Sequence, residues 1–125
     1  MKKIIIDTNA LMAMAEYRVD VIEETNKTLD FPHQFCILQG TIVELHQLLK
    51  HEKGKFRRAA KLALSILRAK SKKIKIIKEQ GNVDDLLAEQ SETGNLILTQ
   101  DIELKKRLTK PYLTIRQKKK VIIVK

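Results

Sequence analysis

Four acidic side chains stand at corresponding places along this chain, each at the end of a predicted strand or in the first turn of the helix that follows one. They are Asp7, Glu44, Asp84 and Asp101. The parallel strands of an open α/β sheet bring their carboxyl ends to one edge, and such sheets bind their ligands beyond that edge. We therefore expect the four carboxylates to face one crevice.

Carboxylates gathered in one crevice repel each other, and their pKa values rise unless a cation neutralises them. Hard divalent cations meet that need, because Mg²⁺ or Mn²⁺ typically binds a few carboxylates together with waters and phosphate oxygens. This donor set predicts hydrolysis of a phosphodiester, in which one ion activates water and a second, if bound, stabilises the leaving oxygen. Thr8, Asn9 and Thr99 are predicted to hold the carboxylates or their waters from behind.

Two of these positions also have a structural interpretation. Glu44 lies three residues after Thr41, which matches a capping box in which the glutamate bonds the amide of the cap residue. Asp84 and Asp85 stand side by side at the start of a predicted helix, and Asp84 would make a good N-cap. Each acid can therefore serve the helix, the metal or both.

The elements that position these acids follow from the hydrophobic pattern. Residues 3–9 open with a β-branched run that is typical of a buried parallel strand and delivers Asp7 to its carboxyl end. Residues 95–101 repeat this design and end in Asp101. Further strands are predicted at residues 35–38, 74–78, 113–116 and 121–124, and helices at residues 9–16, 19–29, 40–50, 55–68, 83–91 and 102–108.

The predicted order is β-α-α-β-α-α-β-α-β-α-β-β, which indicates one three-layer α/β/α domain over residues 1–125 with a largely parallel central sheet. A chain of 125 residues can bury such a core without disulfides, and the single Cys36 is interpreted as a small buried apolar side chain. No apolar stretch approaches membrane-spanning length, and the start does not fit a signal peptide. We expect a cytoplasmic protein without a membrane partner.

Charge is the strongest compositional signal. The chain has 25 Lys and Arg against 15 Asp and Glu, a net charge of +10, and residues 53–78 and 104–125 contain basic residues but no acid. This segregation predicts a polyanionic partner such as RNA, although a Lys-rich surface that serves solubility is the alternative. The candidate RNA contacts are Arg57, Arg58, Lys61, Lys105, Lys106 and Arg107.

Four motifs resemble those of the PIN-domain ribonucleases, in the family's order and over nearly the whole chain. They are Ile-Ile-Ile-Asp-Thr-Asn, Ile-Val-Glu-Leu, Val-Asp-Asp-Leu-Leu and Leu-Thr-Gln-Asp-Ile-Glu-Leu-Lys-Lys-Arg-Leu. The resemblance implies a PIN-like fold and a Mg²⁺- or Mn²⁺-dependent endoribonuclease. Its metal-binding acids would be Asp7, Glu44, Asp84 and Asp101. The family pattern favours Asp84 as the main ligand, because the apolar positions Leu87 and Ala88 then follow on the buried side of the helix, with Asp85 as a helper.

The resemblance leaves the biological role open. The last motif is most similar to the small-subunit rRNA-processing nucleases, and related archaeal proteins are VapC-like. It therefore implies either work on preribosomal RNA or a VapC-type toxin with an antitoxin partner. The competing class is a non-catalytic RNA-binding or ribosome-assembly factor with the same fold.

Family members often form homodimers, for which Leu11, Met12 and Met14 or the helix at residues 55–68 are candidate faces. The chain has few aromatic residues, so base stacking is expected to contribute little to RNA binding.

Overall fold

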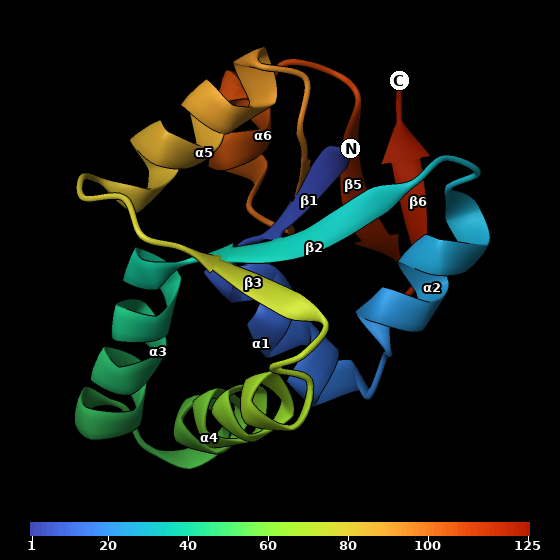
Figure 1. The fold of residues 1–125 in the computed structure, drawn as a ribbon. Coiled ribbons are helices and arrows are strands. Elements are labelled where there is room, and N and C mark those ends of the chain that lie inside the picture. The colour runs from blue at the N-terminus through green and yellow to red at the C-terminus, as the bar shows by residue number, and fades with distance from the viewer.

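The computed structural model describes residues 1–125, and its strands and helices alternate in the predicted order (Figure 1). The deviations lie at the ends of elements. Strand β2 begins two residues before its predicted start, and the helix predicted at residues 19–29 begins only after Asp20, whose side chain caps it. The elements are β1 (Lys2–Ile6), α1 (Thr8–Tyr17), α2 (Val21–Thr28), β2 (His33–Leu38), α3 (Gln39–His51), α4 (Gly54–Ala69), β3 (Ile74–Ile77), α5 (Val83–Glu92), β4 (Leu96–Leu98), α6 (Ile102–Arg107), β5 (Tyr112–Arg116) and β6 (Lys120–Val124).

All six strands form one sheet in the order β3-β2-β1-β4-β5-β6. Every pairing is parallel except that of β5 with β6, so the expectation of a largely parallel sheet is confirmed. In β1, Ile4 is in register with Phe35 of β2 on one side and Leu96 of β4 on the other. Asp7 therefore follows a central strand, and the ends of β2 and β4 flank it.

Alternate residues of the strands supply two cores, one on each face of the sheet. Ile4 and Ile6 belong to the larger core with residues of α1, α2, α3 and α4, whereas Ile5 belongs to the smaller core with residues of α5 and α6. Figure 1 shows α5 and α6 on one side of the sheet and α1, α3 and α4 on the other. The predicted three-layer α/β/α arrangement is confirmed.

Two predicted helix caps are wrong. Helix α3 begins at Gln39, so Thr41 lies inside it, and the buried Thr41 hydroxyl has no hydrogen-bond partner. Helix α5 is capped by Asn82, whose Oδ1 accepts the Asp85 amide at 3.0 Å, and not by Asp84. Neither Glu44 nor Asp84 therefore caps its helix, and both side chains are available to the groove.

The prediction that Leu11, Met12 and Met14 of α1 form a dimer contact is also wrong in part. Leu11 and Met14 are buried in the core beneath α1, so their side chains cannot meet a second copy of the chain. The exposed apolar side chains of α4 are Phe56 and Leu62. Cys36 is a free and buried side chain, as expected. None of the helices has the length and hydropathy required to span a bilayer.

Candidate active site

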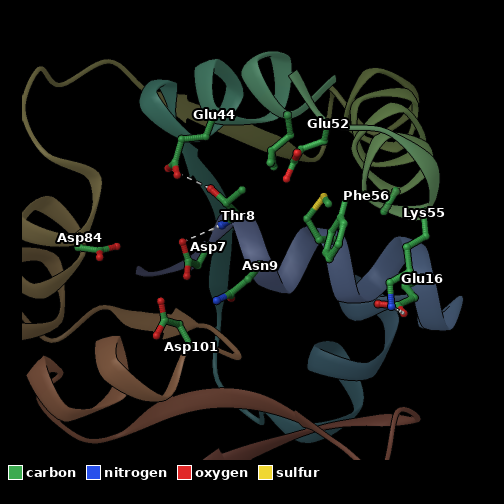
Figure 2. A pocket seen from close by; sticks show the side chains of 13 residues that line it. Asp7, Thr8, Asn9, Glu16, Glu44, Glu52, Lys55, Phe56, Asp84 and Asp101 are labelled. Carbon is green, nitrogen blue, oxygen red and sulfur yellow. Dashed lines mark hydrogen bonds and ion pairs between the residues drawn. The ribbon is translucent and has the colours of Figure 1, made fainter. Parts of the chain in front are cut away.

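A groove of about 410 Å³ opens beyond the carboxyl ends of β1, β2 and β4, and the structure brings all four predicted acids to it. Figure 2 shows Asp7 between Glu44 and Asp101, with Asp84 facing them from α5. The groove is lined by Asp7, Thr8, Asn9, Met12, Glu16, Glu44, Leu48, Glu52, Lys55, Phe56, Ala59, Asp84 and Asp101.

Asp7 is the most buried of these acids, with 5% of its surface exposed. It follows β1 directly and is the N-cap of α1, where its Oδ1 accepts the Thr8 amide at 2.7 Å. Its Oδ2 accepts the Thr99 hydroxyl at 2.8 Å. Its own amide donates to the Leu98 carbonyl at 2.9 Å, which ties the end of β1 to the end of β4.

The surroundings of Asp7 favour its neutral form. Burial raises the pKa of Asp7 from 3.8 to about 6, the bonds from Thr99 and Thr8 oppose that rise, and the nearby carboxylates of Asp84 and Glu44 add to it. No Lys or Arg forms an ion pair with Asp7. At neutral pH the groove therefore contains a buried negative charge that the chain itself does not neutralise.

Glu44 reaches the groove from the second turn of α3 and accepts the Thr8 hydroxyl on Oε1 at 3.1 Å. Burial raises the pKa of Glu44, the Thr8 bond lowers it, and the Asp84 carboxylate raises it further. Thr8 thus bridges two acids, since its amide holds Asp7 and its hydroxyl holds Glu44.

Asp84 lies in the first turn of α5 and lines the groove, whereas the adjacent Asp85 turns away from it. Asp85 pairs instead with Arg107 of α6 at 2.5 Å. A side-chain Cβ at Gly40 would come within 2.7 Å of Val83, so this glycine lets the start of α3 approach the start of α5. That approach brings the helix that carries Glu44 close to the helix that carries Asp84.

Asp101 is the N-cap of α6, and its Oδ1 accepts the amides of Glu103 and Leu104 at 2.9 and 3.2 Å. Polar contacts hold the loop before it in place. Thr99 accepts the Asp101 amide at 3.1 Å, and Asn9 accepts the Gln100 amide at 3.0 Å. The Gln100 Oε1 accepts the Ile115 amide of β5 at 2.7 Å. Sequence reasoning missed Gln100, whose side chain acts only through its tertiary contacts with Thr114 and Ile115 of β5.

The donor set fits a hard divalent cation. All four acids offer carboxylate oxygens, and none of them is in an ion pair. Burial is the main cause of the raised pKa values of Asp7 and Glu44, and neighbouring carboxylates add to it. No three of the acids converge closely enough to ligate one ion directly. Mg²⁺ usually keeps several waters and contacts only one or two carboxylates, so this spacing suits an ion held partly through water.

Comparisons with known proteins agree with this geometry. The family described as "PIN like domain" matches residues 4–118, which include the whole groove. The chain belongs to the PIN-like family.

Two proteins from Methanocaldococcus jannaschii are similar to this PIN-like chain, one in sequence and one in fold. Ribonuclease VapC4 is 35% identical over 127 residues, covering 95% of this chain and 94% of its own. A domain of a functionally unknown protein from the same organism has a TM-score of 0.56 at 17% identity, covering 85% of this chain and 83% of its own. The PIN domain endonuclease Utp24 has a TM-score of 0.74 at 22% identity, covering 97% of this chain and 90% of its own. The two structural likenesses concern the fold.

None of the six basic residues predicted to contact RNA lines the PIN-like groove itself. Arg107 lies at its acidic end, where its guanidinium meets Asp85 and the carboxylate of Asp84 adds to the rise in the Arg107 pKa. Arg58 lines a shallow hollow beside Glu16. Lys61 lines a separate groove between α3 and α4, and Arg57 donates to the Leu49 carbonyl. Lys105 and Lys106 lie beside Arg107 on α6.

Sequence reasoning missed the far half of the PIN-like groove. Its floor is formed by two helical stripes in which groove residues recur every fourth position, a spacing that puts side chains on one helix face. That spacing is readable in the sequence, but it also fits a stripe buried in the core. The stripes are Thr8, Met12 and Glu16 on α1 and Glu44, Leu48 and Glu52 on α3.

The Thr99 hydroxyl allows a pH-resolved test of this PIN-like site. It bonds the charged form of Asp7, so Thr99→Val should raise the Asp7 pKa further and destabilise the fold at pH 7.5 by about 1.5–3 kcal/mol, with a smaller loss at pH 4. Urea unfolding in EDTA measures both values. Thr114→Val is the control, because the Thr114 hydroxyl bonds the neutral Gln100 amide. Equal losses from Thr99→Val at both pH values would contradict the assignment.

Proposed function

We propose that this chain is an endoribonuclease that depends on Mg²⁺ or Mn²⁺ and hydrolyses RNA phosphodiester bonds. The observation that carries the proposal is the buried Asp7 carboxylate, which lies among other acids without a cationic partner. Such a charged group lowers the stability of the fold unless a bound cation neutralises it, and this pattern is common at functional sites. The family and the ribonuclease relative support the same reaction.

In this proposal Asp7, Glu44, Asp84 and Asp101 hold the ion, directly or through water, and Asp85 has no more than an auxiliary role because it is paired with Arg107. The chemistry that such an ion supplies is activation of water and neutralisation of charge on the phosphate. The residues behind the acids keep them in place. Thr8 joins Asp7 to Glu44, Thr99 holds Asp7 from inside the fold, and Asn9 fixes the loop that leads to Asp101.

The positive charge of the chain supports RNA as the substrate. A net charge of +10 attracts phosphates, and the acidic groove itself would repel them without a bound cation. Arg107 stands next to Asp84 at the acidic end, so it can meet a phosphate that approaches the acids. A cytoplasmic location is part of the same proposal.

The proposal is tested by cleavage of a labelled single-stranded RNA by the purified protein. We expect cleavage with Mn²⁺ or Mg²⁺, none in EDTA, and recovery when Mn²⁺ is added back. Single-stranded DNA of the same sequence serves as the comparison substrate. A homogeneous, folded protein that cuts no RNA with either ion would overturn the proposal.

The alternative is an RNA-binding or ribosome-assembly factor that lacks turnover. One observation favours it, namely that no three acids converge on a single ion position. It predicts RNA binding that weakens with salt, persists in EDTA and leads to no cleavage with any metal. The cleavage assay above separates the two functions.

Two roles fit the enzyme. A VapC-type toxin, with an antitoxin as its partner, is supported by 35% identity to Ribonuclease VapC4 over nearly the full chain. Processing of preribosomal RNA is supported by the fold shared with Utp24 at lower identity. Expression in a host that lacks an antitoxin distinguishes them, because only the toxin role predicts growth arrest.

A further inference from the structure

Past the four acids the groove is also lined by four apolar side chains, which form its apolar section. They are Met12 of α1, Leu48 of α3, and Phe56 and Ala59 of α4, and the charged Glu16, Glu52 and Lys55 line the groove with them. Figure 2 shows the Phe56 ring beside Lys55 and Glu16, on the opposite side of the groove from Asp84. The acids and this apolar section therefore share one continuous surface.

Phe56 is unusual because its large apolar ring is exposed in the groove. It is one of only three phenylalanines in the chain, and 52% of its surface is exposed although α4 buries other apolar side chains. Lys55 lies over its ring at 5.5 Å from the centroid and approaches Glu16 at 4.0 Å. An exposed aromatic ring beside a cation is the combination that binds a nucleobase and its neighbouring phosphate in single-stranded nucleic acid.

The length of the groove suits a strand of RNA. Asp7 and Glu16, at the two ends of α1, both line it, and they are separated by roughly 14 Å at the usual helical rise. Stacked nucleotides advance by roughly 3.4 Å each, so a strand whose scissile phosphate meets the acids places a flanking nucleotide near the far end.

We infer that Phe56 is a stacking platform for one nucleobase of a single-stranded RNA substrate, close to the bond that is cut. This inference rests on the proposed function and adds the class of ligand for the apolar half of the groove. It also revises the expectation that stacking contributes little, because a single well-placed ring is sufficient to hold one base.

The test pairs variants of Phe56 with abasic substrates. In short single-stranded RNAs that the wild-type protein cuts at one site, each nucleotide near the cut is replaced in turn by an abasic one. We expect one position at which the wild-type kcat/KM falls by about 10- to 100-fold, the usual range for a lost base–aromatic stack. Phe56→Ala should cut the intact RNA more slowly by a similar factor and show no further loss at that position.

Two variants control for indirect effects. Phe56→Trp keeps a ring and should restore both the rate and the abasic penalty. Leu62→Ala removes another exposed apolar side chain from the same helix, outside this groove, and should cut like the wild-type protein. Because Phe56 is exposed, Phe56→Ala should keep the wild-type unfolding midpoint. An abasic penalty that persists unchanged in Phe56→Ala, or a rate unchanged by that substitution, would overturn the inference.

A binding experiment tests the stacking platform even if the proposed nuclease activity is absent. If the wild-type protein cuts no RNA, stacking is measured by binding, as quenching of Phe56→Trp fluorescence by oligouridylate and oligoadenylate in EDTA. Quenching that an abasic oligomer of the same length does not produce supports the platform without turnover. Equal quenching by the abasic oligomer contradicts the platform.

Discussion

Asp7→Asn should abolish RNA cleavage and at the same time stabilise the fold. We expect the cleavage rate to fall on the order of 10³-fold or more, because the substitution removes the most buried anionic ligand of the proposed metal site. The amide keeps the shape of the side chain, and its oxygen can still accept the Thr8 amide. Loss of activity would therefore not reflect loss of the fold.

The gain in stability follows from the direction of the pKa shift. Below pH 3.8 Asp7 is protonated in both the folded and the unfolded chain, and between pH 3.8 and about 6 only the folded chain keeps the proton. Stability contributed by this group is thus lost as pH rises through the folded pKa. A rise from 3.8 to about 6 corresponds to about 3 kcal/mol at neutral pH, which is the upper limit of the gain.

Urea unfolding of both proteins in EDTA, from pH 4 to pH 7.5, measures this effect. The two proteins should be similar at pH 4, differ increasingly up to about pH 6, and keep a nearly constant difference from there to pH 7.5. Asp30→Asn is the control, since Asp30 is an exposed carboxylate away from the groove. An Asp7→Asn protein that is less stable than the wild type at pH 7.5 would show that the Asp7 carboxylate is compensated within the chain.

Divalent cations should raise the stability of the wild-type protein at pH 7.5. A cation that binds only the folded chain adds about 2.7 kcal/mol at 100 times its dissociation constant. The effect should be much smaller below pH 6, because protons compete for Asp7, whose pKa is about 6. Thermal unfolding with MgCl₂ or MnCl₂, against KCl at equal ionic strength, measures the shift.

Two substitutions locate the bound cation. Asp7→Asn should remove most of the stabilisation by Mn²⁺, and Glu44→Gln should reduce it. Both carboxylates line the groove, and the pKa of each is raised by burial and by a neighbouring carboxylate. Glu89→Gln, an exposed acid on α5 away from the groove, should leave it unchanged. Equal stabilisation of all four proteins by Mn²⁺ would place the cation elsewhere on the surface.

The order of the elements was predictable because it depends on local pattern. β-Branched runs such as Ile4–Ile6 favour strands whatever surrounds them, and the apolar spacing of α4 favours a helix. Helix starts were less predictable, since several good cap residues stand close together. Asn82 and Asp84 have similar cap propensities, and the folded chain uses Asn82.

The sequence by itself determined a buried strand that ends in Asp7, the alternation of helices and strands, and the ordered acids. Only the tertiary structure decided that β1 lies between β2 and β4, that Asp85 pairs with Arg107 while Asp84 faces the groove, and that Phe56 lines the same groove. The physical reason is the distance along the chain over which each effect acts. Propensities act over a few residues, whereas desolvation and repulsion between carboxylates depend on distances that exist only once remote segments have packed.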